Sequence, residues 1–116
     1  MIRRIIFYGD YFLDFYSQQN EATQTKIEFV LELIRTIERV PIKFFKYLEG
    51  TDGLYEIRVR SGNKNIRIIC FLDEGNLVIL INSFVKKSMK IPKKEIDLAE
   101  RLKKEYFNKK FKGESS

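Results

Sequence analysis

The chain has 116 residues, of which 44% are hydrophobic and 33% charged, and its net charge is +6. These values are typical of one folded domain with a single core, and they exclude a disordered chain or two independent domains. The absence of histidine excludes imidazole catalysis and the common zinc sites, and the single cysteine, Cys70, excludes an intramolecular disulfide and a multi-cysteine metal site.

The N-terminal part of the chain predicts a strand followed by two helices. Residues 2–8 are rich in β-branched and aromatic side chains, which favours a strand. Gly9 and Asp10 then offer a break and a helix N-cap, and apolar residues at helical spacing from Phe12 onward predict a short helix. Residues 21–39 repeat apolar side chains at the same spacing and predict a second helix before Pro41.

The middle of the chain predicts a connector and then three strands. Residues 41–53 form the connector, and their aromatic side chains should fold back onto the core. Strands follow over residues 55–60, 66–72 and 77–81, and the short turns between them make the meander antiparallel. The last strand, LVILI, is almost wholly apolar and is expected at the centre of the sheet, buried on both faces.

The C-terminal part predicts a final helix with Pro92 in its first turn, and residues 109–116 should form a frayed, solvated tail. The predicted order β-α-α-β-β-β-α makes the whole chain one α+β domain, with the helices on one face of a small antiparallel sheet and the other face partly open. No apolar stretch approaches the roughly 20 residues that span a bilayer, and no signal-peptide core is present. We therefore expect a cytoplasmic protein without membrane contact.

Residues 54–94 carry the whole net charge of the chain. This segment holds nine Lys or Arg residues and three acids, whereas the remainder is balanced. Cations among strand residues can form a fixed positive surface, which attracts a polyanion such as RNA. The alternative is that the charge serves solubility alone.

Three segments could bring cations around one carboxylate. The alternating strand over residues 55–60 places Glu56, Arg58 and Arg60 on one face, which we expect to be the open face of the sheet. Strand pairing could add Arg67, whose side chain should be exposed, and the segment after the third strand could add Lys86 and Lys87. The alternative for Glu56 and Arg58 is an ion pair on a solvated sheet, which contributes little.

This set of side chains suits cleavage of RNA by its own 2′-hydroxyl, which needs a proton acceptor, stabilisation of the phosphorane and help for the leaving oxygen. Glu56 would accept the proton or orient the site, and Arg58 and Arg67 would hold the phosphate. Lys87 or Lys86 would stabilise the phosphorane or assist the leaving group. We expect no metal and no cofactor to be required.

Four motifs resemble those of a known family. The segments LYEIR (54–58), RIICF (67–71), FVKKSMKIP (84–92) and EIDLA (95–99) are similar to the RelE/HigB toxins of bacterial type II toxin–antitoxin modules, and most similar to their phage-derived, HigB-like branch. The chain departs from many relatives at Asn82, where they carry a histidine. Asparagine cannot shuttle a proton but can donate a hydrogen bond to phosphate.

The resemblance implies a RelE-like fold of the microbial-ribonuclease type and an endoribonuclease that cuts translated mRNA on the ribosome. It implies an antitoxin partner, often a helix-turn-helix protein of the HigA type. It also implies functional roles for Glu56, Arg58, Arg67 and Lys87. RNA contacts are expected from the polar and basic side chains around these four, namely Arg60, Lys64, Asn82, Lys86 and Lys90.

Two other functions remain open from the residues alone. One is a nonenzymatic relative of the same superfamily, such as a ParE-like poison of DNA gyrase. The other is a nucleic-acid-binding module without toxicity. The Glu-x-Arg strand, together with Arg67 and the two lysines, favours the nuclease.

Overall fold

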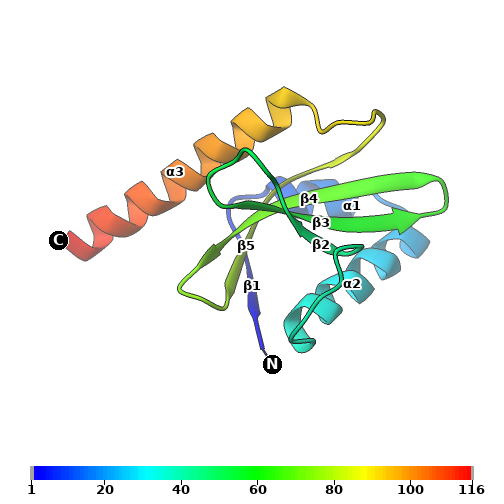
Figure 1. The fold of residues 1–116 in the computed structure, drawn as a ribbon, viewed down its shortest axis with the longest axis horizontal. Coiled ribbons are helices and arrows are strands. Elements are labelled where there is room, and N and C mark those ends of the chain that lie inside the picture. The colour runs from blue at the N-terminus through cyan, green and yellow to red at the C-terminus, as the bar shows by residue number, and fades with distance from the viewer. Residues whose placement is uncertain (1, 116) are drawn as a thin grey trace.

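A five-stranded sheet lies at the centre of the molecule, with helices on both of its faces (Figure 1). The structure is a computed structural model that describes residues 2–115, and this part of the chain contains five strands and three helices. In chain order these elements are β1 (Arg4–Phe7), α1 (Tyr11–Ser17), α2 (Glu21–Thr36), β2 (Phe45–Tyr47), β3 (Leu54–Ser61), β4 (Lys64–Asp73), β5 (Leu77–Val85) and α3 (Lys93–Ser115).

The strand order in the sheet is β1-β5-β4-β3-β2. The predicted meander of β3, β4 and β5 is confirmed and is antiparallel throughout. Strand β5 lies between β1 and β4, and the side chains of residues 78–81 are fully buried, which confirms the predicted central strand. Two pairings were not predicted: β1 runs parallel to β5, and the short strand β2, within the expected connector, pairs with β3.

The two faces of the sheet each have their own apolar core. On one face α1 and α2 pack against side chains of alternate strand positions, such as Ile68 and Cys70. On the other face α3 packs against the intervening positions, such as Ile69 and Phe71. The prediction that all helices lie on one face is therefore wrong. Successive residues of β4 are apolar and buried, so this strand requires cover on both sides.

Helix α2 ends earlier than the sequence predicts, at Thr36 instead of residue 39. Asn20 caps its beginning by accepting a hydrogen bond from the Thr23 N–H at 2.8 Å. At its other end, Ile37 has an extended backbone, and the guanidinium of Arg3 donates to the carbonyl oxygens of Ile34 and Ile37. This side chain supplies partners for carbonyls that the helix itself leaves unpaired.

Helix α3 is fixed to the sheet near both of its ends. Near its start, the Asn82 amide donates to the backbone and side-chain oxygens of Glu95, at 3.0 Å each. Further along, Asp73 accepts from the Tyr106 hydroxyl at 2.6 Å and from Lys110 at 3.0 Å. The helix continues through Ser115, so the expected tail over 109–116 is helical as far as residue 115; Ser116 lies outside the described residues.

No helix within residues 2–115 is both long enough and apolar enough to cross a membrane. Cys70 on β4 is fully buried. Burial raises the pKa of its thiol far above the ordinary value, so Cys70 is a packing residue and not a nucleophile.

Candidate nucleic-acid interface

A group of polar side chains lies on the face of the sheet against which α3 packs, which we call the α3-side face. The group lies toward the end of the β3–β4 hairpin, which extends past the beginning of α3 (Figure 1). The strand register places Arg58 opposite Arg67 and Arg60 opposite Asn65. The Lys86 N–H donates to the Asn65 carbonyl oxygen at 2.7 Å, which extends this row to the end of β5. We call this group the cationic patch; it comprises Glu56, Arg58, Arg60, Asn65, Arg67 and Lys86.

A β-bulge in β5 adjusts which residues reach the patch. Cys70 pairs with Leu80, but Ile68 pairs with Ser83, so β5 has one extra residue between these two pairs. An extra residue reverses the alternation of side chains beyond it. As a result, Phe84 lies beside Arg67 on the α3-side face, and Lys86 follows two residues later on the same face.

Glu56 is the centre of the patch. One of its carboxylate oxygens lies 3.4 Å from Arg58 Nε, and the other lies 3.7 Å from Arg67 Nε. The side chains of Glu56 and Arg67 are each 8% exposed, whereas that of Arg58 is 32% exposed. The sequence predicted that Glu56 and Arg58 share a face, which is confirmed. The carboxylate of this pair is buried and Arg58 is partly exposed, so the pair is not the fully solvated one of the alternative interpretation.

Arg67 is buried, so the expectation of an exposed side chain is wrong. It lies on β4, flanked by β3 and β5, with Arg58 on one side and Phe84 on the other. Burial lowers the pKa of the Arg67 guanidinium, and the positive charge of Arg58 acts in the same direction while Glu56 opposes both. The group remains a cation at neutral pH because arginine starts from so high a value. Its Nη1 donates to the Ile66 carbonyl oxygen at 3.1 Å, which fixes the orientation of the guanidinium.

The lysines that follow β5 line one side of the patch. Lys86 is half-buried beside Asn65, and the next residue, Lys87, is exposed. Lys90 is also exposed, and the Ser88 hydroxyl donates to the Lys90 carbonyl oxygen at 2.8 Å within the loop. The structure therefore places the cations of two strands, Arg58 and Arg67, beside the Glu56 carboxylate. The segment after β5 reaches this region through the backbone of Lys86, and a role for its lysine side chains at Glu56 stays a prediction.

Two predicted RNA-binding residues lie apart from the patch. Lys64 lies on the opposite face of β4, where its ammonium group is 3.5 Å from the side-chain oxygen of Gln19, two residues after the end of α1. Asn82 is 3% exposed, and its amide is occupied by Glu95 at the start of α3. Lys64 thus faces away from Arg58 and Arg67, whereas Asn82 lies on their face of the sheet but is buried, with its amide nitrogen bonded to α3.

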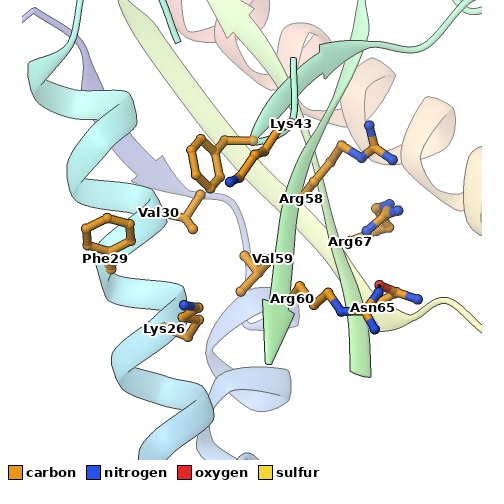
Figure 2. A pocket seen from close by; sticks show the side chains of 10 residues that line it. Lys26, Phe29, Val30, Lys43, Arg58, Val59, Arg60, Asn65 and Arg67 are labelled. Carbon is orange, nitrogen blue, oxygen red and sulfur yellow. Dashed lines mark hydrogen bonds between the residues drawn. The ribbon is translucent and has the colours of Figure 1, made fainter. Parts of the chain in front are cut away.

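A groove extends from the patch around the edge of the sheet to helix α2 (Figure 2). This α2–β3 groove has a volume of about 710 Å³. Residues from four segments line it: Lys26, Phe29 and Val30 of α2, Lys43 and Phe44 before β2, Arg58, Val59 and Arg60 of β3, and Asn65 and Arg67 of β4.

The sequence analysis did not identify the α2 side of this groove. One signal was present: the buried side chains of α2 include Ile27, Val30 and Ile34, and Phe29 falls outside that stripe. An aromatic residue on the polar side of a helix stays exposed, and Phe29 is 53% exposed. Lys26 carried no comparable signal, because lysines are common on exposed helix faces.

The chemistry available at the interface is that of guanidinium, ammonium and amide donors around a single carboxylate. These groups bind phosphate oxygens, and arginine can do so through two parallel hydrogen bonds. Within residues 2–115, no three His, Cys, Asp or Glu side chains lie close enough together to hold a metal ion.

Comparisons with known proteins agree with this fold. The family model described as phage-derived protein Gp49-like (DUF891) matches residues 14–104. A chain of the archaeal RelE–RelB complex from Pyrococcus horikoshii OT3 is similar in structure, with a TM-score of 0.51 and 24% identity over 73% of this chain and 96% of that chain. A chain of the RelB–RelE antitoxin–toxin complex from Methanococcus jannaschii has a TM-score of 0.52 and 20% identity, over 75% and 99% of the two chains.

These likenesses confirm the predicted α+β fold of the RelE type. The two solved structures share the fold with this chain at low sequence identity. A comparison with curated protein sequences finds no match.

Proposed function

The chain belongs to the phage-derived Gp49-like family within the RelE/HigB superfamily, and on this premise we propose that it is the toxin of a type II toxin–antitoxin module that cuts mRNA. The observation that carries the proposal is the buried Glu56 carboxylate with Arg58 and Arg67 on its two sides. A buried charge is costly, and a protein retains such a group most readily where it orients other charges. Here it orients two guanidiniums. The loop over residues 86–92, which we call the lysine loop because it carries Lys86, Lys87 and Lys90, follows β5.

The proposed reaction is attack of an RNA 2′-hydroxyl on the adjacent phosphorus. The bond from O2′ to phosphorus forms and the bond from phosphorus to O5′ breaks, which leaves a 2′,3′-cyclic phosphate and a 5′-hydroxyl. The 2′-hydroxyl gives its proton to water, and the leaving oxygen takes a proton from the ammonium group of Lys87 or Lys86 or from water. Arg58 and Arg67 hold the nonbridging oxygens, and Lys87 or Lys86 stabilises the charge that develops on the phosphorane and the leaving oxygen.

We assign Glu56 to the orientation of the two arginines, and not to proton transfer. Each of its oxygens faces a guanidinium, and only 8% of the side chain is exposed. A substrate hydroxyl would have to displace one of these arginines to reach the carboxylate. The role of Glu56 is therefore to fix the distance between the two groups that hold the phosphate.

The proposed partners are mRNA on the ribosome and a cognate antitoxin, with the cytoplasm as the place of action. Support for an antitoxin comes from the two similar solved structures, which are complexes of RelE with RelB. A helix-turn-helix antitoxin of the HigA type follows from the HigB-like sequence motifs. An antitoxin that covered the cationic patch with acidic side chains would complement its charge.

Inducible expression of the chain without an antitoxin tests the proposal. We expect growth arrest together with new RNA 5′ ends in register with codons, and cyclic phosphates at the matching 3′ ends. Arg58→Ala should abolish the cuts, because Arg58 is the more exposed of the two phosphate-binding arginines. Lys104→Ala, an exposed cation on α3, is the matched control and should cut normally. Glu56→Gln should reduce the rate of cutting and leave its pH dependence unchanged.

Three results would contradict the proposal. Arrest with DNA breaks and intact mRNA would indicate a gyrase poison of the ParE type. Normal growth with an abundant, folded protein would indicate a nucleic-acid-binding module without toxicity. Loss of the acidic limb of the pH–rate profile in Glu56→Gln would show that Glu56 is a general base instead of an orienting group.

A further inference from the structure

The α2–β3 groove opens where strand β2 ends. Strand β2 pairs with β3 only as far as Phe45 opposite Ile57, and the last backbone contact on this side is the Arg58 N–H to the Phe44 carbonyl oxygen at 2.8 Å. Beyond this point the edge of β3 faces α2 across the groove (Figure 2). The floor is apolar, because Val30 and Val59 are both buried. The groove is thus a long depression along an open strand edge.

The walls of the groove are strongly cationic. Five of its ten lining residues are basic and none is acidic; the basic residues are Lys26, Lys43, Arg58, Arg60 and Arg67. They come from α2, the segment before β2, β3 and β4, so the positive charge surrounds the depression on several sides. A concave surface that carries one sign of charge concentrates the electrostatic field. Such a surface favours an extended anion over a neutral partner or one that carries charges of both signs.

Two aromatic side chains lie among these cations. Phe29 is 53% exposed at the α2 rim of the groove, where it contributes little to the core. Phe44 lines the opposite side, and the Lys43 ammonium lies 5.2 Å from the centre of its ring. Phe44 is half-buried and packs against the core, so Phe29 is the ring of this pair that is open to a base. An exposed ring between cations is a usual means of binding single-stranded nucleic acid, because a base stacks on the ring while phosphates contact the cations.

The groove is continuous with the cationic patch. Arg58, Arg60, Asn65 and Arg67 belong to both, so a strand whose phosphate lies between Arg58 and Arg67 can continue directly across β3 toward Phe29. We propose that the α2–β3 groove binds the single-stranded RNA that flanks the cut, with Phe29 stacking on a base and Lys26 and Lys43 contacting phosphates. This inference rests on the proposed function and assigns its substrate contacts beyond the scissile bond.

Binding of two RNA lengths tests this inference. The probes are a fluorescent single-stranded RNA of about 12 nucleotides, a length within the range that such surfaces cover, and a trinucleotide that spans only the cut. Phe29→Ala should raise the Kd for the longer RNA about tenfold, the loss expected for one stacked base. Lys26→Ala should reduce the slope of log affinity against log salt by about 0.7, the loss of one phosphate contact.

The variants have matched controls. Phe29→Tyr keeps the ring and should bind as the wild type does. Leu13→Ala removes an exposed apolar side chain from α1, and Lys104→Ala an exposed cation from α3, so neither should change the Kd. The Kd for the trinucleotide should be the same in Phe29→Ala and the wild type, because this probe is too short to reach the groove. Equal melting temperatures would show that all variants are folded.

The outcomes separate this inference from the proposed function. If the wild type cuts RNA, but Phe29→Ala and Lys26→Ala leave the Kd unchanged, then the groove does not bind the flanking RNA and the proposed nuclease function still holds. If the wild type produces no RNA cuts when expressed in cells, but its binding of the longer probe depends on Phe29, the result supports RNA binding by the groove and contradicts the proposed nuclease. If both variants bind RNA normally but escape neutralisation by an antitoxin, the groove binds protein and the inference is wrong.

Discussion

At the scale of single residues, Arg67 and Glu56 depend on each other. Both side chains are almost completely buried, and Arg67 Nε lies 3.7 Å from a carboxylate oxygen of Glu56. Desolvation of two charges is expensive, and their mutual attraction only offsets that cost while both are present. The pair therefore fixes the geometry of the proposed site, and removal of either partner should destabilise the folded state.

Arg67→Ala should lower the free energy of unfolding by about 3 kcal/mol, because it leaves the Glu56 carboxylate buried with Arg58 alone and creates a cavity beside Phe84. Urea denaturation measures this change. Arg60→Ala is the matched control: Arg60 is exposed on the same face, and its replacement should cost no more than about 0.5 kcal/mol. Equal stability of the two variants would show that the Glu56–Arg67 pair carries no structural role. Because of this cost, the cutting activity of Arg67→Ala must be measured per folded molecule.

At the scale of elements, α3 is held by a polar contact near each end and by an apolar face between them. Its C-terminal contact is the Asp73 carboxylate on β4, which accepts from Tyr106 and from Lys110. Burial alone would raise the pKa of Asp73, but the hydrogen bonds from Tyr106 and Lys110, with the charge of Lys110, lower it below its ordinary value. Burial and the bond to Asp73 raise the pKa of Tyr106 to about 12.

This contact predicts how stability depends on pH. A carboxyl group with a lowered pKa in the folded state stabilises the fold above its unfolded pKa, and that stabilisation is lost as the pH falls through the folded value. Asp73→Asn should therefore cost about 1 kcal/mol at neutral pH, and its difference from the wild type should shrink as the pH falls below about 3.9, the ordinary pKa of aspartate, and through the lower folded value. Thermal unfolding at a series of pH values measures this.

The control for this experiment is Asp97→Asn on α3. Asp97 forms an exposed ion pair with Lys93 at 3.0 Å, and exposed pairs contribute little. It should show no comparable loss at neutral pH. A difference between Asp73→Asn and the wild type that stayed constant across the acidic range would show that the carboxylate charge of Asp73 is not what holds α3.

The strands show how far the sequence could predict the fold. The alternation around Glu56 and Arg58 and the apolar run in β5 are local patterns, and both were interpreted correctly. The parallel pairing of β1 depends on contacts between distant segments, so no local pattern could predict it. Cover on both faces did have a local signal, because the apolar runs of β4 and β5 require it, but that signal did not show which helix covers which face. The position of Lys64 was predictable in part: it is three residues from Arg67 on the same strand, and an odd spacing places two side chains on opposite faces.

The burial of Arg67 and the position of Asn82 had no such signal. Arg67 is buried because β3 and β5 flank it, and the bulge in β5 brings Phe84 beside it. A bulge changes the register by one residue without a distinct sequence motif in this chain. Charge and alternation could thus predict that Glu56, Arg58 and Arg67 lie together, whereas the burial of Arg67 and the contact of Asn82 with α3 could not be predicted.

At the scale of the whole molecule, the positive charge gathers on one continuous surface. The cationic patch on the α3-side face and the α2–β3 groove around the edge of β3 share four residues, so they form a single path for an anion. The two helical layers leave this region of the sheet open, because α1 and α2 cover one face and α3 begins only after the lysine loop (Figure 1).

This arrangement predicts a steep salt dependence of RNA binding by the wild type. Six cations line the patch and the groove, namely Lys26, Lys43, Arg58, Arg60, Arg67 and Lys86. If each contacts one phosphate, log affinity should fall against log salt with a slope of about −4 for a single strand. Anisotropy of a labelled RNA over a salt series measures the slope. A slope near zero would show that this surface does not bind a polyanion.

The burial of Cys70 also makes the chain convenient for spectroscopy. Its only thiol is inaccessible to solvent and is kept protonated by its apolar surroundings. A cysteine introduced on an exposed position would therefore be the single site open to a maleimide dye, without any need to remove the native one. Fluorophores placed in this way on α1 or on the loop before α3 could report RNA docking in real time while the packing of β4 remained untouched.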